Sequence, residues 1–128
     1  MRDDSVNFIS GHLDLTEAEF EAHYKPSINL ALEHDESFIV GDARGADTHA
    51  QHYLHGKTTK VVVYHMLTKP RNNAGFSTLG GFQSDTERDQ QMTHDSDQDI
   101  AWIRPGPGRK RSGTQANLDR RKKLGSRE

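Results

Sequence analysis

Two glycine-containing turns follow hydrophobic runs, and each leads into a helical pattern. The turn GDARGAD, at Gly41–Asp47, follows the apolar run at 37–41, and Gly113-Thr114 follows the run at 100–103. The first N–H groups of a helix have no partner within the helix, so a turn of this kind presents donors that bind phosphate. Two such turns in a chain of 128 residues predict a ligand that carries phosphate, such as a nucleotide.

The remaining ligand-binding candidates are polar residues near these turns and near the first apolar run. A guanidinium holds phosphate through two parallel hydrogen bonds, which makes Arg88 the strongest side-chain candidate. The Thr114 hydroxyl is a further donor, and Asn117, one helical turn on, is expected to bond a ribose hydroxyl. The full predicted set is Ser10, Gly11, His12, Gly41, Asp42, Arg44, Gly45, Arg88, Gly108, Ser112, Gly113, Thr114 and Asn117.

Each of these candidates also has an ordinary structural interpretation. Ser112 and Thr114 suit a helix N-cap, and Gly41 and Gly45 suit simple turns. For Arg88 the alternative is a charged helix face with the acidic partners Asp85, Glu87 and Asp89. Residues that we expect to be structural are Asp47 at a helix start, and Met92 and Trp102 in the core.

The elements that must position these residues alternate between strands and helices. Strands are predicted at 6–10, 37–41, 60–66 and 99–103, and helices at 16–32, 46–55, 84–94 and 113–123. Thr16 and Glu19 form a capping box, and Pro26 predicts a break near Lys25. Residues 68–82 are expected to be a long loop. The alternation predicts an α/β protein, with a mainly parallel sheet of four to five strands between two layers of helices.

Composition restricts the class of protein. The length predicts one domain over 1–121 with a basic tail at 122–128, and the absence of cysteine rules out disulfides and thiolate metal sites. No apolar run approaches the roughly 20 residues that span a bilayer, and the first residues lack a signal-peptide core. We therefore expect a cytoplasmic protein without a membrane partner. His49, His52 and His55 read as an exposed helix face, so neither a metal nor a cofactor is expected.

The charge is unevenly distributed. Residues 104–128 hold nine Lys or Arg and two acids, whereas the rest holds eight and seventeen. A basic end of this kind is able to contact nucleic acid, although the acidic remainder makes a long binding groove an unfavourable interpretation. A homodimer that buries Tyr53 and Leu54 between helices is a further arrangement that the sequence leaves open.

The order of these motifs resembles the SLOG superfamily of Rossmann-like domains. That superfamily includes the Lonely Guy phosphoribohydrolases, the DNA processing protein A family and small proteins of the YspA type. Arg88 with Met92, the strand at 97–102, Pro107-Gly108 and Gly113-Thr114 match its late signature, and GDARGAD is similar to a turn of the YspA branch. The resemblance covers about residues 6–121 and implies a Rossmann-like fold that binds a nucleotide-derived ligand, as a sensor or a sequestering module.

Hydrolysis of an N-glycosidic bond is the alternative activity. The phosphoribohydrolases place a catalytic glutamate three residues after the threonine, where this chain has Asn117. Because the reaction passes through an oxocarbenium-like state, another carboxylate has to lie beneath the sugar. The candidates for this are Asp42, Glu87 and Asp14, with Arg88 as the phosphate-binding partner. A third alternative is binding of nucleic acid through the basic end.

Overall fold

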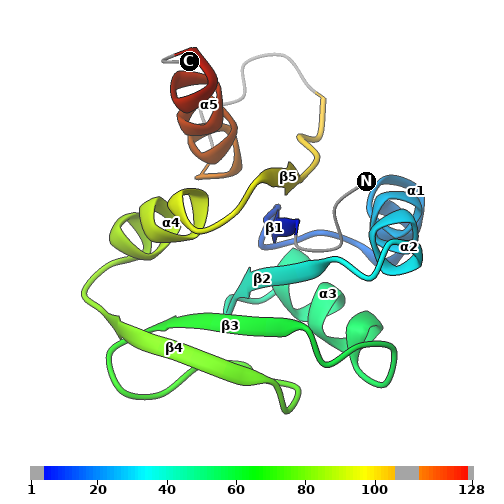
Figure 1. Cartoon of the computed structure of the whole chain (residues 1–128), viewed down its shortest axis with the longest axis horizontal. Coiled ribbons are helices and arrows are strands. Elements are labelled where there is room, and N and C mark those ends of the chain that lie inside the picture. The colour runs from blue at the N-terminus through cyan, green and yellow to red at the C-terminus, as the bar shows by residue number, and fades with distance from the viewer. Residues whose placement is uncertain (1–4, 106–112, 127–128) are drawn as a thin grey trace.

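The computed structural model describes residues 5–105 and 113–126, which form an α/β fold (Figure 1). Along the chain the elements are β1 (Val6–Ile9), α1 (Glu17–His23), α2 (Lys25–Glu33), β2 (Ser37–Gly41), α3 (Ala46–Leu54), β3 (Val61–Met66), β4 (Ser77–Phe82), α4 (Asp85–His94), β5 (Gln98–Ile100) and α5 (Gly113–Ser126). No helix within this part of the chain is both long and apolar enough to cross a lipid bilayer.

Within the described ranges, five strands form one sheet in the order β4-β3-β2-β1-β5, and every neighbouring pair is parallel. The chain moves outward from β1 to β4 and then returns through α4 to the other side of β1, where β5 lies (Figure 1). The polypeptide therefore changes direction beside β1. The α/β architecture and the parallel sheet predicted from the sequence are confirmed.

Hydrophobic side chains cover both faces of the sheet, because successive residues of a strand point to opposite sides. Ile9 and Val40 pack with Phe20, Ile28 and other residues of the first three helices. On the other face, Phe8, Ile39 and Tyr64 pack against Met92 of α4. Figure 1 shows the same division, with α1, α2 and α3 on one side of the sheet and α4 and α5 on the other. Met92 is fully buried, as predicted.

The segment before α4 differs from the sequence-based expectation. Its second half is not a loop but the edge strand β4, which pairs with β3. Five of its six residues are exposed, so it carries no hydrophobic alternation that a sequence reading can detect. Gly80 lies against the His65 ring, and a side chain at this position would overlap the ring. The strand therefore depends on its partner β3 rather than on its own residues.

The first helical pattern is interrupted as predicted. Thr16 and Glu19 form a complete capping box at α1. The helix ends at His23, and α2 begins at Lys25 with Pro26 in its first turn, where proline has no N–H to lose. Tyr24, between the two helices, is fully buried.

The last two elements differ in length from the prediction. β5 ends at Ile100, so Trp102 lies beyond the strand, where it is half-buried and stacks on His23 with ring centroids 4.0 Å apart. Trp102 thus packs at the edge of the core instead of inside the sheet. α5 continues through residues 122–126, which the sequence assigns to a tail.

Candidate functional site

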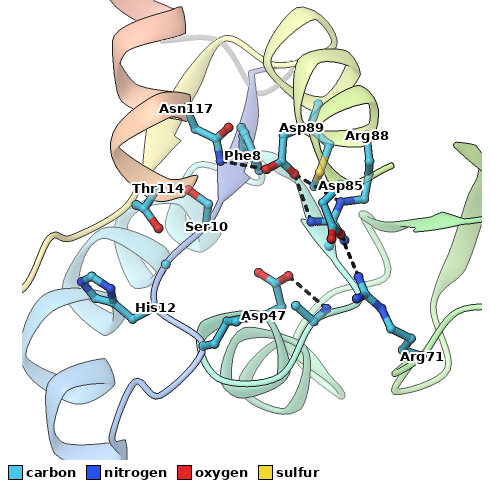
Figure 2. Close-up of a pocket in the computed structure, with 15 residues that line it drawn as sticks. Phe8, Ser10, His12, Asp47, Arg71, Asp85, Arg88, Asp89, Thr114 and Asn117 are labelled. Atoms are coloured by element: carbon cyan, nitrogen blue, oxygen red, sulfur yellow. Dashed lines mark hydrogen bonds and ion pairs between the residues drawn. The ribbon is translucent and has the colours of Figure 1, made fainter. Parts of the chain in front are cut away.

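A cleft of about 430 Å³ opens at the carboxyl ends of β1 and β2, beneath α4 and α5 (Figure 2). We call it the carboxyl-edge cleft. In parallel α/β sheets, ligands bind at this edge, where the direction of the chain reverses. The residues that line the cleft are Phe8, Ser10, Gly11, His12, Leu13, Gly41, Ala43, Asp47, Arg71, Asp85, Arg88, Asp89, Met92, Thr114 and Asn117.

Residues predicted from distant parts of the sequence meet in this cleft. They are Ser10, Gly11 and His12 after β1, Gly41 at the end of β2, Arg88 on α4, and Thr114 and Asn117 on α5. Asn117 donates a hydrogen bond to the Asp89 carboxylate at 3.4 Å, which connects α5 to α4 across the cleft. The start of α5 and the arginine of α4 therefore lie on the same side of the molecule.

Other predicted residues lie outside the cleft. Asp42 is 1% exposed and does not line the cleft, and it pairs instead with Arg71 and Arg88. Arg44, Gly45 and the candidate carboxylate Glu87 do not line it, and Glu87 accepts a hydrogen bond from the Gln83 backbone instead. Asp14, the other candidate carboxylate, pairs with Arg104. Gly108 and Ser112 lie outside the described residues, and Gly113 is the first residue of α5.

Ser10 is the one side chain of the described residues with a buried polar atom that has no hydrogen-bond partner. It is 7% exposed and lines the cleft at the end of β1. Leaving a hydroxyl buried without a partner costs about 1–3 kcal/mol, and such groups are rare in native proteins. Figure 2 shows the Ser10 hydroxyl oriented toward Thr114 and Asn117 of α5.

Two glycines allow close approach of the backbone, Gly41 in the cleft wall and Gly45 in the turn beside it. A side chain at Gly41 would place its Cβ 2.6 Å from an Asp47 carboxylate oxygen and 3.2 Å from the Arg88 guanidinium carbon. Gly45 has a φ of 76° and lies against the His12 and Leu13 carbonyl oxygens. The next residue of the chain, at the start of α3, donates its N–H to the His12 carbonyl at 3.1 Å. The turn after β2 is thereby fastened to the turn after β1.

Among the residues that the structure describes, four carboxylates surround two arginines at this site. Arg88 donates to Asp42 at 2.9 Å and to Asp89 at 3.0 Å, and its guanidinium lies 3.2 Å from Asp85. Arg71 pairs with Asp42 and Asp85 at 2.7 and 3.1 Å. The fourth carboxylate, Asp47, accepts the Ala43 backbone N–H at 3.2 Å. The Arg88 guanidinium is therefore already bound to carboxylates of the protein itself, and it cannot bind a ligand independently of them.

Burial raises the pKa of two of these carboxyls. The pKa of Asp47 is raised to about 7, chiefly because burial disfavours its charged form, although the positive charge of Arg88 opposes the shift. Burial also raises the pKa of Asp89, against the hydrogen bonds from Arg88 and Asn117. For Asp42, burial acts in the same direction, but hydrogen bonds from Arg71 prevail and lower its pKa. The cleft thus contains a carboxyl, that of Asp47, with a pKa near neutral pH.

Sequence reasoning missed four residues of the cleft wall as functional candidates: Asp47, Arg71, Asp85 and Asp89. Asp47 was predicted to support the start of α3, and it does lie in the first turn of that helix. Arg71 comes from the irregular segment before β4, where no periodicity marks it. Its place is set by Asp42, which accepts both its backbone N–H at 2.7 Å and its guanidinium. Only the folded chain brings these residues together.

The basic end of the chain is partly occupied by contacts within the protein. Arg104 pairs with Glu19 at 2.7 Å and with Asp14 at 3.1 Å, and its backbone N–H donates to His12 Nε2 at 2.8 Å. Arg121 pairs with Asp99 at 3.2 Å. Because these two arginines form ion pairs within the protein, fewer cations remain to contact nucleic acid than the sequence indicates. The His12 ring is directed to Arg104 rather than freely exposed.

The histidines of α3 have separate surroundings. His49 contacts the Leu15 carbonyl at 3.0 Å and stacks on Phe20, whereas His52 and His55 are exposed. Within residues 5–105 and 113–126, no three metal-ligating side chains come together to hold an ion.

Comparisons of the chain with protein-family models, curated proteins and solved structures give no match, so its resemblance to the SLOG superfamily stays a prediction.

Proposed function

We propose that the protein binds a phosphorylated ribosyl ligand, such as a nucleoside monophosphate, an ADP-ribose-like molecule or a cyclic nucleotide, in the carboxyl-edge cleft. The observation that carries the proposal is the buried, unpartnered Ser10 hydroxyl, which lies in the same cleft as Thr114 at the start of α5. A hydroxyl without a partner, beside a helix N-terminus, is a donor available to an incoming anion.

The phosphate is assigned to the α5 side of the cleft. α5 is 14 residues long, and its first N–H groups carry the positive end of the helix dipole. Thr114, in its first turn, is 5% exposed and lines the cleft. The hydroxyls of Ser10 and Thr114 together with these N–H groups supply donors from two elements.

The sugar is assigned to the acidic side of the cleft. Asp47 and Asp89 line it, and carboxyl groups form hydrogen bonds with ribose hydroxyls, which both donate and accept. A ligand that carried only phosphate groups would meet these carboxylates with like charge. A ligand with hydroxyls at one end and an anion at the other matches both sides, and the volume of the cleft falls in the range of small-molecule sites.

Titration calorimetry with AMP, ribose 5-phosphate and adenosine tests this proposal. AMP and ribose 5-phosphate are expected to bind, and adenosine is expected to bind more weakly because it lacks the anion. Ser10→Ala and Thr114→Val each remove one donor, so we expect AMP binding to weaken about 3- to 10-fold. The matched controls are Ser27→Ala and Thr59→Val, whose exposed side chains lie outside the cleft. Absence of heat with all three compounds rejects the proposal.

Hydrolysis of an N-glycosidic bond is the second candidate, and the carboxyls in the cleft favour it. A proton-holding acid such as Asp47 is suited to protonate a leaving base, and a carboxylate such as Asp89 to stabilise the positive charge at the anomeric carbon. Water would add to that carbon as the C–N bond breaks. Release of adenine from AMP that is abolished in Asp89→Asn and retained in Glu87→Gln, outside the cleft on the same helix, supports this activity. No release by the wild-type protein excludes it for AMP.

A further inference from the structure

We infer, on the basis of the function proposed above, that Asp47 is a specificity-determining residue whose carboxyl group binds the ligand as a neutral hydrogen-bond donor. An anionic ligand then enters the carboxyl-edge cleft together with one proton. In this arrangement the cleft selects ligands that place an acceptor oxygen against Asp47.

The position of Asp47 limits the partners that it has within the protein. It lies in the first turn of α3, is 8% exposed and forms part of the cleft wall. Its Oδ2 accepts the Ala43 N–H at 3.2 Å, whereas Oδ1 bonds no donor of the described residues. Figure 2 shows the carboxyl group directed into the space that Ser10 and Thr114 also face. A ligand in the cleft therefore meets this carboxyl directly.

The charges around Asp47 make its negative form unfavourable when an anion is present. The titratable groups that face this region are Tyr24 between α1 and α2, His12 after β1, Asp42 after β2, Arg71 before β4, and Asp85, Arg88 and Asp89 on α4. Within the described part of the chain, Asp47 and three other carboxyls thus share two guanidinium groups. Arg88 is already bound to Asp42 and Asp89, and Arg71 to Asp42 and Asp85. An anionic ligand adds negative charge to a cluster in which the described carboxyl groups already outnumber the described guanidinium groups.

A proton on Asp47 removes one of these negative charges and supplies a donor. The pKa of the Asp47 carboxyl is already raised to about 7 by burial, so protonation near neutral pH costs little free energy. Burial also raises the pKa of the Asp89 carboxyl, but it accepts hydrogen bonds from Arg88 and Asn117, which need its oxygens as acceptors. Among the described residues, no side chain donates to Asp47 in this way, and it is therefore the carboxyl that we expect to hold the proton.

Calorimetry of AMP binding at about pH 8, in Tris and in HEPES, measures the protons taken up with the ligand. At this pH, Asp47 of the free protein is mostly ionised and the phosphate is a dianion. We expect uptake of close to one proton per AMP, and a Kd that rises about tenfold for each pH unit above 7. Binding with the same heat in both buffers overturns the inference and leaves the proposed function intact. No binding in any buffer overturns the proposed function as well.

Two variants distinguish a proton donor from a structural role. Asp47→Asn keeps the shape and a donor N–H but cannot take up a proton, so it is expected to bind AMP with an affinity that no longer falls above pH 7. Its proton uptake is expected to be near zero. Glu87→Gln is the matched control on α4 outside the cleft, and it is expected to keep the wild-type uptake. If Asp47→Asn keeps the wild-type proton uptake and pH dependence, another group holds the proton and the inference is wrong.

Discussion

Arg88 and Asp42 form a buried ion pair with a distance of 2.9 Å, and their side chains are only 7% and 1% exposed. Breaking a buried pair leaves one charge without compensation in a medium that solvates it poorly. The pair also fixes the guanidinium between α4 and the end of β2, where it forms one wall of the carboxyl-edge cleft. Arg88 thus has a structural role in addition to any contact with a ligand.

Arg88→Ala is expected to lower the free energy of unfolding by about 3–5 kcal/mol, because it leaves Asp42 buried with Arg71 as its remaining cation. Urea denaturation measures this change. Arg44→Ala removes an exposed arginine three residues before Asp47, and it is the matched control with an expected change within about 0.5 kcal/mol. Equal losses in the two variants would show that the pair with Asp42 contributes little.

The raised pKa of Asp47 predicts how stability changes with pH. In the unfolded chain this carboxyl has its ordinary pKa of 3.8, and in the folded protein its pKa is about 7. Between these values the folded state binds more protons than the unfolded state, so the contribution of Asp47 to stability falls as pH rises from about 4 to 7. Below pH 4 both states are protonated, and the full contribution is present.

Asp47→Asn removes this titration. Since one pKa unit corresponds to about 1.4 kcal/mol, we expect the variant to gain about 2–4 kcal/mol relative to the wild-type protein at pH 8 and much less at pH 4. Thermal or urea unfolding at several pH values gives the comparison. A difference between the two proteins that stays constant over this range contradicts an elevated pKa.

Gly45 is expected to be intolerant of a side chain for two reasons. Its positive φ costs an alanine about 1–3 kcal/mol, and the added Cβ would overlap the His12 and Leu13 carbonyls. Gly56 also has a positive φ, of 85°, but open space surrounds its Cβ position. Gly56→Ala therefore measures the backbone cost alone. Thermal denaturation is expected to show a larger loss of stability for Gly45→Ala than for Gly56→Ala. Equal losses would mean that the turn after β1 moves to accept the added Cβ at no extra cost.

Tyr24 fastens the end of β1 to the segment after β5. Its buried hydroxyl donates to the Ser10 carbonyl at 2.8 Å and accepts the Trp102 N–H at 3.1 Å. Burial raises its pKa to about 12, so it stays a donor over the physiological range. Tyr24→Phe leaves both backbone groups without this partner and is expected to cost about 1–3 kcal/mol.

Tyr53→Phe is the control for this substitution, because the hydroxyl of Tyr53 bonds Asn29 near the surface. A hydrogen bond exposed to water is readily replaced, so a change within about 0.5 kcal/mol is expected. Chemical denaturation of both variants makes the comparison. A loss at Tyr53 as large as that at Tyr24 would contradict the role given to the Ser10–Trp102 connection.

The amino-acid sequence by itself determined the α/β class, the capping box at Thr16, the break before Pro26 and most helix and strand positions. These features follow from local chemistry, since periodicity, capping residues and proline act over a few residues. It also identified Ser10 and Gly41 as cleft residues, because the carboxyl ends of parallel strands meet at one edge of the sheet. Arg88 and Thr114 were identified by their chemistry, as a guanidinium and a helix N-terminal hydroxyl that suit a phosphate.

Tertiary structure alone decided the remaining features. β4 is a strand because β3 pairs with it, although its own residues are mostly exposed. Asp42 forms ion pairs with Arg88 and Arg71 instead of lining the cleft. Asp47, which the sequence assigns only to a helix start, lines the cleft and has a raised pKa. Ion pairing and burial depend on neighbours that lie 29 and 46 positions away along the chain from Asp42. No local pattern encodes such distances, and for this reason the charge balance of the cleft emerges only in the folded protein.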